Sequence, residues 1–163
     1  MNDVEKARLA GAIWIHGSID IEHSTKRQYY YPRIMLSMKN LLPFDYQKDM
    51  GGNVWAGNDG YITPEIGKQK LVEKRLKEIL PLMGECSLEK KQIEIALKII
   101  EINKSGEPKT EKKKKLEELY QQSKKLREEL KNWIQDFKAE YKDVEKKNIP
   151  AKIWNRANLL EDY

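Results

Sequence analysis

The side chains that most often perform catalysis or bind metals are scarce in this chain. There are two histidines, His16 and His23, and a single cysteine, Cys86. No HExxH pair, no Gly-rich phosphate loop and no plausible nucleophile triad accompanies them. A lone cysteine excludes an internal disulfide framework and a cysteine zinc site, and it suits a reducing compartment. We expect Cys86 to be a small packing residue in a short loop between helices rather than a nucleophile.

The composition fits one soluble domain that carries more positive than negative side chains. The chain has 163 residues, 31 Lys and Arg against 26 Asp and Glu, and a net charge of +5, which permits nucleic-acid binding. No apolar run approaches the roughly 20 residues that cross a bilayer. The N-terminal residues show no secretory cleavage pattern. We therefore expect no membrane partner and no secretion, with a location in the cytoplasm of a prokaryote or in an organelle.

The pattern along the first hundred residues predicts alternating helices and strands. A helix is expected from Asp3 to about Ile15, because Asn2 or Asp3 can cap it and apolar residues recur at helical spacing. Residues 18–22 alternate polar and apolar after Gly17, and residues 29–40 are rich in β-prone types. A short helix or turn at 41–50, a hairpin at 53–63 that Pro64 ends, and helices at 68–80 and 88–102 follow. This order predicts an α+β fold with an antiparallel sheet.

The residues after 102 predict a separate C-terminal extension. Residues 103–109 are typical of a linker, and a long charged helix is expected from about 110 to 147. Its apolar residues keep to one stripe. We expect residues 110–163 to be a helical extension that packs on a core of residues 1–102. A coiled-coil surface for a partner chain is the alternative.

Residues 9–19, with the sequence LAGAIWIHGSI, are the most informative stretch. They combine the end of the first predicted helix with the start of the first strand, and Ala10 and Gly11 place two small residues side by side. Small residues let two helices approach closely. The helix is therefore either a seam between two copies of the chain or a closely packed element of one domain, and the spacing alone does not separate the two.

This stretch resembles the motif of the LAGLIDADG homing endonucleases. Leu9, Ala10 and Gly11 match the opening of that motif, Ile13 an interior position and Gly17 the closing glycine, and Ser18-Ile19 follow as is common there. Residues 68–101 resemble the two later helices of the family. The resemblance implies an αββαββα core whose saddle-shaped sheet lies in the DNA major groove. For a chain with one motif it also implies a homodimer on a two-fold symmetric double-stranded target of about twenty base pairs. The implied dimer interface comprises Leu9, Ala10, Ala12 and Ile13.

The resemblance also implies which side chains face DNA, since side chains in a strand alternate between the two faces. Counted from His16, the groove-facing residues of the first strand and the turn after it are Ser18, Asp20, Glu22, Ser24, Lys26 and Gln28. On the second strand they are Arg33, Ser37 and Asn40, and in the hairpin Asn53, Trp55, Asn58 and Tyr61. These sets include the residue types that bind base edges: Arg and Lys for guanine, Asn and Gln for adenine, and carboxylates for cytosine.

The motif departs from the family at the position that the chemistry needs most. Members carry a metal-binding acid at the eighth motif position, where this chain has His16, and Trp14 stands at the sixth. An imidazole is a poor ligand for Mg²⁺, the cofactor that cleavage would require, although it suits softer metals. Near the start of the last core helix, where the family often has a basic residue, the chain has Glu89. Lys90 and Lys91 follow directly, and a slip of one register would restore a basic group.

Three explanations of His16 remain open at this stage. In the first, the chain is a DNA-binding protein that has lost cleavage. In the second, it carries a single substitution of the acid. In the third, a neighbouring acid such as Asp20 or Glu22 supplies the metal ligand, or His16 itself binds a transition metal. We favour sequence-specific double-stranded DNA binding with cleavage weak or lost. The alternatives are an active Mg²⁺-dependent, intron-encoded endonuclease and an RNA-binding maturase that helps a host intron to splice.

Overall fold

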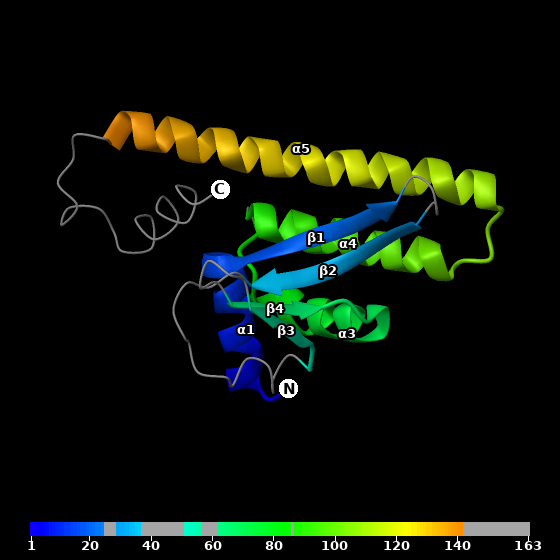
Figure 1. The fold of residues 1–163 in the computed structure, drawn as a ribbon, viewed down its shortest axis with the longest axis horizontal. Helices are drawn as coiled ribbons and strands as arrows, with labels where there is room; N and C mark the ends of the chain where they lie inside the picture. The colour runs from blue at the N-terminus through cyan, green and yellow to red at the C-terminus, as the bar shows by residue number, and fades with distance from the viewer. Residues whose placement is uncertain (25–28, 37–50, 57–61, 86, 142–163) are drawn as a thin grey trace.

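The computed structural model describes residues 1–24, 29–36, 51–56, 62–85 and 87–141, which form one antiparallel sheet and a set of helices (Figure 1). In chain order the elements are α1 (Asp3–His16), β1 (Gly17–Ser24), β2 (Tyr29–Leu36), β3 (Asn53–Ala56), β4 (Ile62–Ile66), α3 (Gln69–Ile79), the short 3-10 helix η1 (Leu80–Leu82), α4 (Leu88–Lys104) and α5 (Lys109–Tyr141). The α+β class predicted from the sequence is confirmed. The helix or turn predicted at 41–50 lies outside the described residues.

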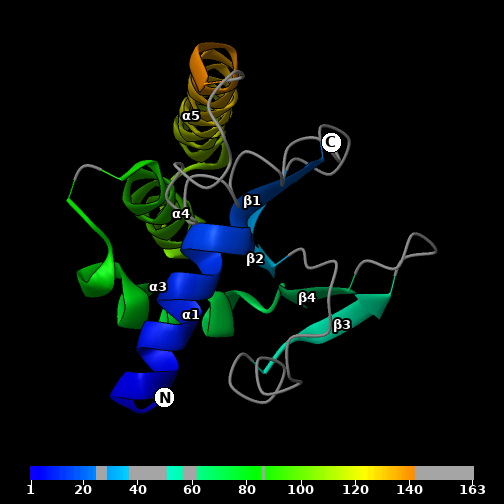
Figure 2. The same cartoon turned by 90° about the vertical axis from the view of Figure 1, so that its left-hand side faces the viewer.

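The sheet has the strand order β1-β2-β4-β3, and all neighbouring strands are antiparallel. β1 and β2 pair over their full length, from Gly17 opposite Leu36 to Ser24 opposite Tyr29. Helices α1, α3 and α4 cover one face of the sheet (Figure 2). No helix of the described part of the chain covers the other face.

The junction between α1 and β1 places His16. α1 begins with a capping box, in which the Asn2 side chain accepts a hydrogen bond from the Glu5 backbone N–H at 2.9 Å and the Glu5 carboxylate accepts one from the Asn2 N–H at 2.7 Å. The helix ends at Gly17, which is already extended, with φ −107° and ψ 161°. His16 is therefore the last residue of α1, directly before the first strand, and its side chain is outside the description.

Gly17 sits where no side chain fits. A Cβ atom there would lie 2.5 Å from the Ile13 Cα and 2.7 Å from the Leu36 Cδ2. We expect Gly17→Ala to lower the free energy of unfolding by about 1–3 kcal/mol, as overpacking does. Urea denaturation followed by circular dichroism measures this. Gly84→Ala is the control, because a Cβ at Gly84 meets nothing within 4 Å; equal stabilities of the two variants would contradict the close packing at the junction.

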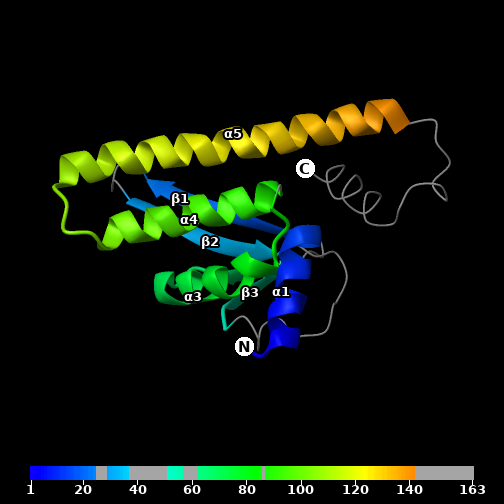
Figure 3. The ribbon, with the colours of Figure 1, turned by 180° about the vertical axis from the view of Figure 1, so that it is seen from behind.

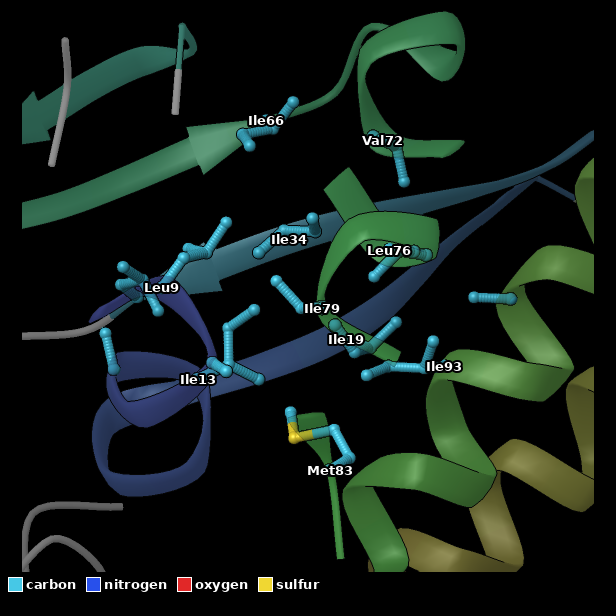
Figure 4. Close-up of a cluster of buried hydrophobic side chains, with 14 of the residues drawn as sticks. Leu9, Ile13, Ile19, Ile34, Ile66, Val72, Leu76, Ile79, Met83 and Ile93 are labelled. Carbon is cyan, nitrogen blue, oxygen red and sulfur yellow. The ribbon is translucent and has the colours of Figure 1, made fainter. Parts of the chain in front are cut away.

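The main hydrophobic core lies between α1, the sheet, α3 and α4 (Figure 4). Its fully buried side chains come from all of these elements and include Leu9, Ile13, Ile19, Ile34, Ile66, Leu76, Ile79 and Ile93. Burying an aliphatic side chain contributes about 1.5–3 kcal/mol. This cluster therefore fixes the sheet against its helices and leaves the opposite face of the sheet to polar residues.

The same core corrects the predicted dimer interface. Leu9, Ala10, Ala12 and Ile13 are packed into their own chain and are at most 7% exposed. The residues of α1 that are not buried there include Val4, Ala7, Gly11 and Trp14. The prediction was wrong because α1 has small and apolar residues on both of its sides, and the sequence does not say which side the rest of the chain covers.

Pro64 does not end the hairpin, as the sequence analysis expected, but lies inside β4 opposite Val54. β4 pairs with β2 only at Glu65 and Ile66, so at Pro64 the strand has no ladder partner on that side. Proline lacks a backbone N–H and is tolerated where no ladder hydrogen bond needs one. The strand therefore continues through it.

α5 folds back along the β1 edge of the sheet and beside α4 (Figure 3). A second apolar cluster joins Ile21, Tyr30, Ile95 and Ile99 to Leu116 of α5. Tyr30 also donates a hydrogen bond to Glu117, and the His23 ring lies between Tyr30 and Tyr120, with centroids at 4.6 and 4.7 Å. The first half of this helix is thus part of the packed structure. Among the described helices, none has the length and apolar character of a membrane span.

Candidate nucleic-acid interface

The open face of the sheet is polar because the strands alternate. On β1, Ile19 and Ile21 are buried against the helices, and the residues between and beside them lie on the other face: Ser18, Asp20, Glu22 and Ser24. On β2, the buried residues are Tyr30, Pro32, Ile34 and Leu36, and the others are Tyr29, Tyr31, Arg33 and Met35. We call this side of the sheet the open face. On β1 and β2 it carries five of the residues that the sequence analysis assigned to DNA contacts.

The register of the strands gathers charged side chains around Arg33. Arg33 lies opposite Asp20 on β1, and its Nη2 donates to the Asp20 Oδ2 at 2.8 Å. On the other side its Nη1 donates to the Glu65 Oε1 of β4 at 3.4 Å. The Glu22 Oε2 lies 3.8 Å from the same nitrogen. One guanidinium therefore stands among three carboxylates at the centre of the open face.

A second arginine reaches this cluster from α5. Arg127 Nη2 donates to the Asp20 Oδ1 at 2.5 Å and to the Ile19 backbone carbonyl at 3.1 Å. Partial burial raises the pKa of Asp20, but the hydrogen bonds from Arg33 and Arg127 outweigh it, so this pKa lies below its ordinary value. Burial likewise lowers the pKa of Arg33, and the hydrogen bond to Asp20 with the nearby carboxylates more than reverses this. Asp20 and Arg33 are therefore both charged at neutral pH.

Tyrosines flank the charged cluster. The rings of Tyr29 and Tyr31 stack with centroids 4.9 Å apart, and the Tyr29 hydroxyl donates to the Glu22 Oε1 at 2.9 Å. Tyr31 is 43% exposed and is one of the exposed large hydrophobic residues of the described chain. Sequence reasoning missed Tyr31 and Glu65. Tyr31 shares the alternation parity of Arg33 on β2, and that parity could have identified it. Glu65 lies past the predicted end of the hairpin, and only the strand register places it on the open face.

The electrostatics of the open face suit selective contacts rather than general attraction to phosphate. Three carboxylates face two guanidiniums, so the described cluster carries a net charge of −1. Such a centre does not attract a polyanion by charge alone, whereas hydrogen-bonding groups in fixed positions can discriminate between base edges. Two exposed lysines of α5, Lys124 and Lys131, line a pocket with Asp20 and Arg127 and supply positive charge beside the cluster.

The remaining predicted contacts have mixed outcomes. Asn53 is exposed on β3 and lies opposite Glu65, which puts it at the open face. Trp55 is in the same strand, but its side chain is outside the description. Lys26, Gln28, Ser37, Asn40, Asn58 and Tyr61 lie outside the described residues.

The first turn of α4 begins at Leu88, directly after the Ser87 cap. Glu89 in this turn is buried, at 7% exposure. Lys91 lines a groove between α4 and α5 together with Lys98 and Lys125, on the helical side of the sheet. The role predicted for Lys91 at the reacting phosphates stays a prediction. Lys90 is half-buried, and its backbone N–H donates to the Ser87 side chain.

The donor groups do not suit a magnesium ion. Within the described residues, no cluster of three or more His, Cys, Asp or Glu side chains could hold a metal. Both oxygens of Asp20 accept from arginines, and Glu22 accepts from Tyr29. At the motif position itself the chain has His16, and a neutral imidazole lacks the oxygen donors that Mg²⁺ prefers. The third explanation of His16, a ligand from Asp20 or Glu22, would require these carboxylates to give up the arginine and tyrosine partners that they have here.

Comparison with known proteins identifies the fold. No protein-family model and no curated protein matches this chain. Among solved structures it resembles the homing endonuclease I-CvuI in complex with its target in the presence of calcium, with 24% identity and a TM-score of 0.60 over 76% of this chain and 82% of that chain. A complex of I-CvuI with the I-CreI target, containing magnesium and uncleaved DNA, gives 21% identity and a TM-score of 0.58 over 98% of this chain and 94% of that chain. The chain has the homing endonuclease fold.

Proposed function

We propose that this chain is a sequence-specific, double-stranded DNA-binding protein of the LAGLIDADG type, that it acts as a homodimer, and that its DNA cleavage is weak or lost. One observation carries the proposal. A chain with the fold of DNA-bound homing endonucleases keeps an open sheet face on which polar residues and an arginine alternate with core residues. If the open face no longer bound DNA, nothing would favour this alternation of polar residues and an arginine.

The paired strands β1 and β2 fit the major groove. Each has eight residues, and they pair along their whole length. At about 3.4 Å per residue this ribbon is roughly 27 Å long, and the major groove of B-DNA admits a two-stranded ribbon. Arg33 has the guanidinium that pairs with guanine, Asn53 the amide that suits adenine, and Ser18 and Ser24 hydroxyls that bind either. Asp20 and Glu22 instead hold Arg33 in place.

The outer side of α1 supports the homodimer. Val4 is 69% exposed and Trp14 39%, although both are large and apolar. With Ala7 and Gly11 they recur at the spacing of a helix stripe that faces a partner helix. A Cβ at Gly11 would meet nothing within 4 Å, and alanine would favour the helix by about 1 kcal/mol. A second α1 packed closely on Gly11 accounts for a glycine that the single chain does not require.

Bulk at Gly11 is expected to separate the dimer. Gly11→Leu has open space in the single chain, so the variant folds at least as stably as the wild type. We expect its dimer dissociation constant, measured by sedimentation velocity over a concentration series, to rise tenfold or more, or about 1.4 kcal/mol. Gly106→Leu is the control, since a Cβ at Gly106 also meets nothing. A Gly11→Leu chain that still dimerises like the wild type would remove α1 from the interface.

His16 carries the proposal that cleavage is weak or lost. In the family the acids of the two subunits meet near the scissile phosphates, and this chain offers a histidine at the end of α1. Glu89, at a position where the family often has a basic residue, is buried in the first turn of α4. Neither change affects the open face, so recognition survives the loss of cutting.

Competition between nucleic acids tests the proposed partner. The purified chain is bound to a labelled duplex pool and challenged with unlabelled duplex or with structured intron RNA at equal nucleotide concentration. We expect the duplex to compete at least tenfold better. If RNA displaces the duplex more effectively, the chain is an RNA-binding splicing protein instead and the proposed function fails.

A further inference from the structure

α5 lies outside the sheet, yet one of its residues takes part in the open face. Arg127 extends over the β1 edge, where its Nη2 binds a backbone carbonyl and a carboxylate of β1. It lines a pocket of about 240 Å³ between α5 and β1, together with Asp20, Lys124 and Lys131. The contact with the Ile19 carbonyl fixes the guanidinium against the strand, so Arg127 is an anchored group rather than a surface charge.

Asp20 connects this helix to Arg33. Its two oxygens are divided between the two arginines: Oδ1 accepts from Arg127 and Oδ2 from Arg33 at 2.8 Å. Arg33 therefore uses one N–H of Nη2 on Asp20 and one N–H of Nη1 on Glu65. Its two terminal nitrogens have four N–H groups. Within the described residues, two of them remain for the O6 and N7 acceptors of a guanine.

We propose that Arg127 is a positioning residue, which acts through Asp20 to set the base preference of Arg33. The inference rests on the proposed function and adds to it an element outside the sheet. By holding one oxygen of Asp20, Arg127 prevents that carboxylate from taking two N–H groups of Arg33 in the bidentate arrangement that Arg–carboxylate pairs favour. The second N–H pair of Arg33 is thereby kept for the base.

Removing Arg127 changes this balance in a predictable way. The Asp20 carboxylate loses one of its two partners and turns both oxygens to Arg33. Three carboxylates then surround a single guanidinium at the open face, and Arg33 is drawn toward the protein. The loss is confined to the base pair that Arg33 contacts, because the other groups of the open face keep their positions.

The test compares base preferences rather than affinities. Duplexes bound by the wild type, Arg127→Gln and Lys131→Gln are selected from one random library and sequenced. Arg33→Gln first identifies the base position that Arg33 reads. At that position we expect Arg127→Gln to reduce the guanine preference about tenfold. Lys131→Gln removes the same charge from the same helix and pocket, and it should weaken all sequences evenly with the preference unchanged.

A second variant shows whether the altered preference comes from the Asp20 connection or from misfolding of α5. Asp20→Asn breaks the same connection without changing α5, and we expect it to alter the preference at the same position. Circular dichroism and thermal unfolding establish that each variant is folded. In the double variant Arg33→Gln with Arg127→Gln, no further loss at that position is expected, since the two residues act as one unit.

The outcomes separate this inference from the proposed function. If the wild type enriches no sequence, the proposed function fails and the inference with it. If the wild type selects a site and Arg127→Gln weakens every sequence evenly, as Lys131→Gln does, DNA binding stands and only the role of Arg127 is overturned. An altered preference at a position that Arg33→Gln leaves unchanged overturns it equally.

Discussion

Replacement of Arg33 by alanine is expected to weaken binding of the preferred duplex by a factor on the order of 30 to 25,000. A base contact by arginine contributes about 1–3 kcal/mol, and a homodimer makes the contact twice, so the expected loss is about 2–6 kcal/mol. The substitution also leaves Asp20, Glu22 and Glu65 without their shared cation at the open face. Titration of the preferred duplex followed by fluorescence anisotropy measures the change.

The matched control for Arg33→Ala is Lys77→Ala. Lys77 is also ion-paired, with Glu73 at 2.9 Å, but it lies on α3 at the helical side of the sheet. We expect its loss to change affinity less than threefold and to leave the sequence preference intact. Arg33→Ala must in addition abolish the preference at one symmetric pair of base positions. An even loss over all sequences, of the size that Lys77→Ala produces, would mean that Arg33 touches no base.

Replacement of His16 by aspartate is expected to make DNA binding depend on a divalent metal. The two subunits would then bring two carboxylates toward the DNA backbone, where they repel the phosphates unless a hard cation lies between them. We expect His16→Asp to bind its duplex about tenfold more tightly in Mg²⁺ than in EDTA, or about 1.4 kcal/mol, and to give cut product in Mg²⁺. The affinity of the wild type for its duplex should be the same in Mg²⁺ and in EDTA at constant ionic strength.

The control here is His16→Asn, which has the shape of aspartate without its charge. It should show neither the metal dependence nor the cutting. A metal dependence in the wild type would mean that this chain retains a metal site through other residues. A His16→Asp variant that ignores Mg²⁺ would mean that the end of α1 has diverged beyond one side chain, with Trp14 and the buried Glu89 as the first residues to examine.

The sequence predicted those parts of the fold that local rules determine. The helix predicted at 88–102 corresponds to α4, because its apolar residues recur at a regular 3.6-residue spacing and Ser87 caps it. The alternation after Gly17 gave the correct open face of β1, because a one-residue shift would have buried Asp20 and exposed Ile19. Such helices and strands can be predicted from the spacing of their own residues, without knowledge of the rest of the chain.

Contacts between distant segments were not predictable in this way. Nothing in the sequence places Arg127 beside Asp20, which is 107 residues away, or makes Glu65 a partner of Arg33. The residues of α1 predicted for a dimer interface were buried in their own chain for the same reason, since burial of Leu9 and Ile13 depends on where α3 and α4 pack. The resemblance in residues 9–19 supplied the fold, and the geometry of the open face had to come from the structure.

The most direct test of the central claim is selection of bound sequences from a random duplex library at moderate salt. If the open face reads DNA in a homodimer, sequencing should reveal one enriched site of about twenty base pairs with two-fold symmetry. Arg33→Ala should then lose guanine at one pair of symmetric positions in that site. Recovery of an unenriched library from a folded, dimeric protein would contradict sequence-specific recognition by this sheet.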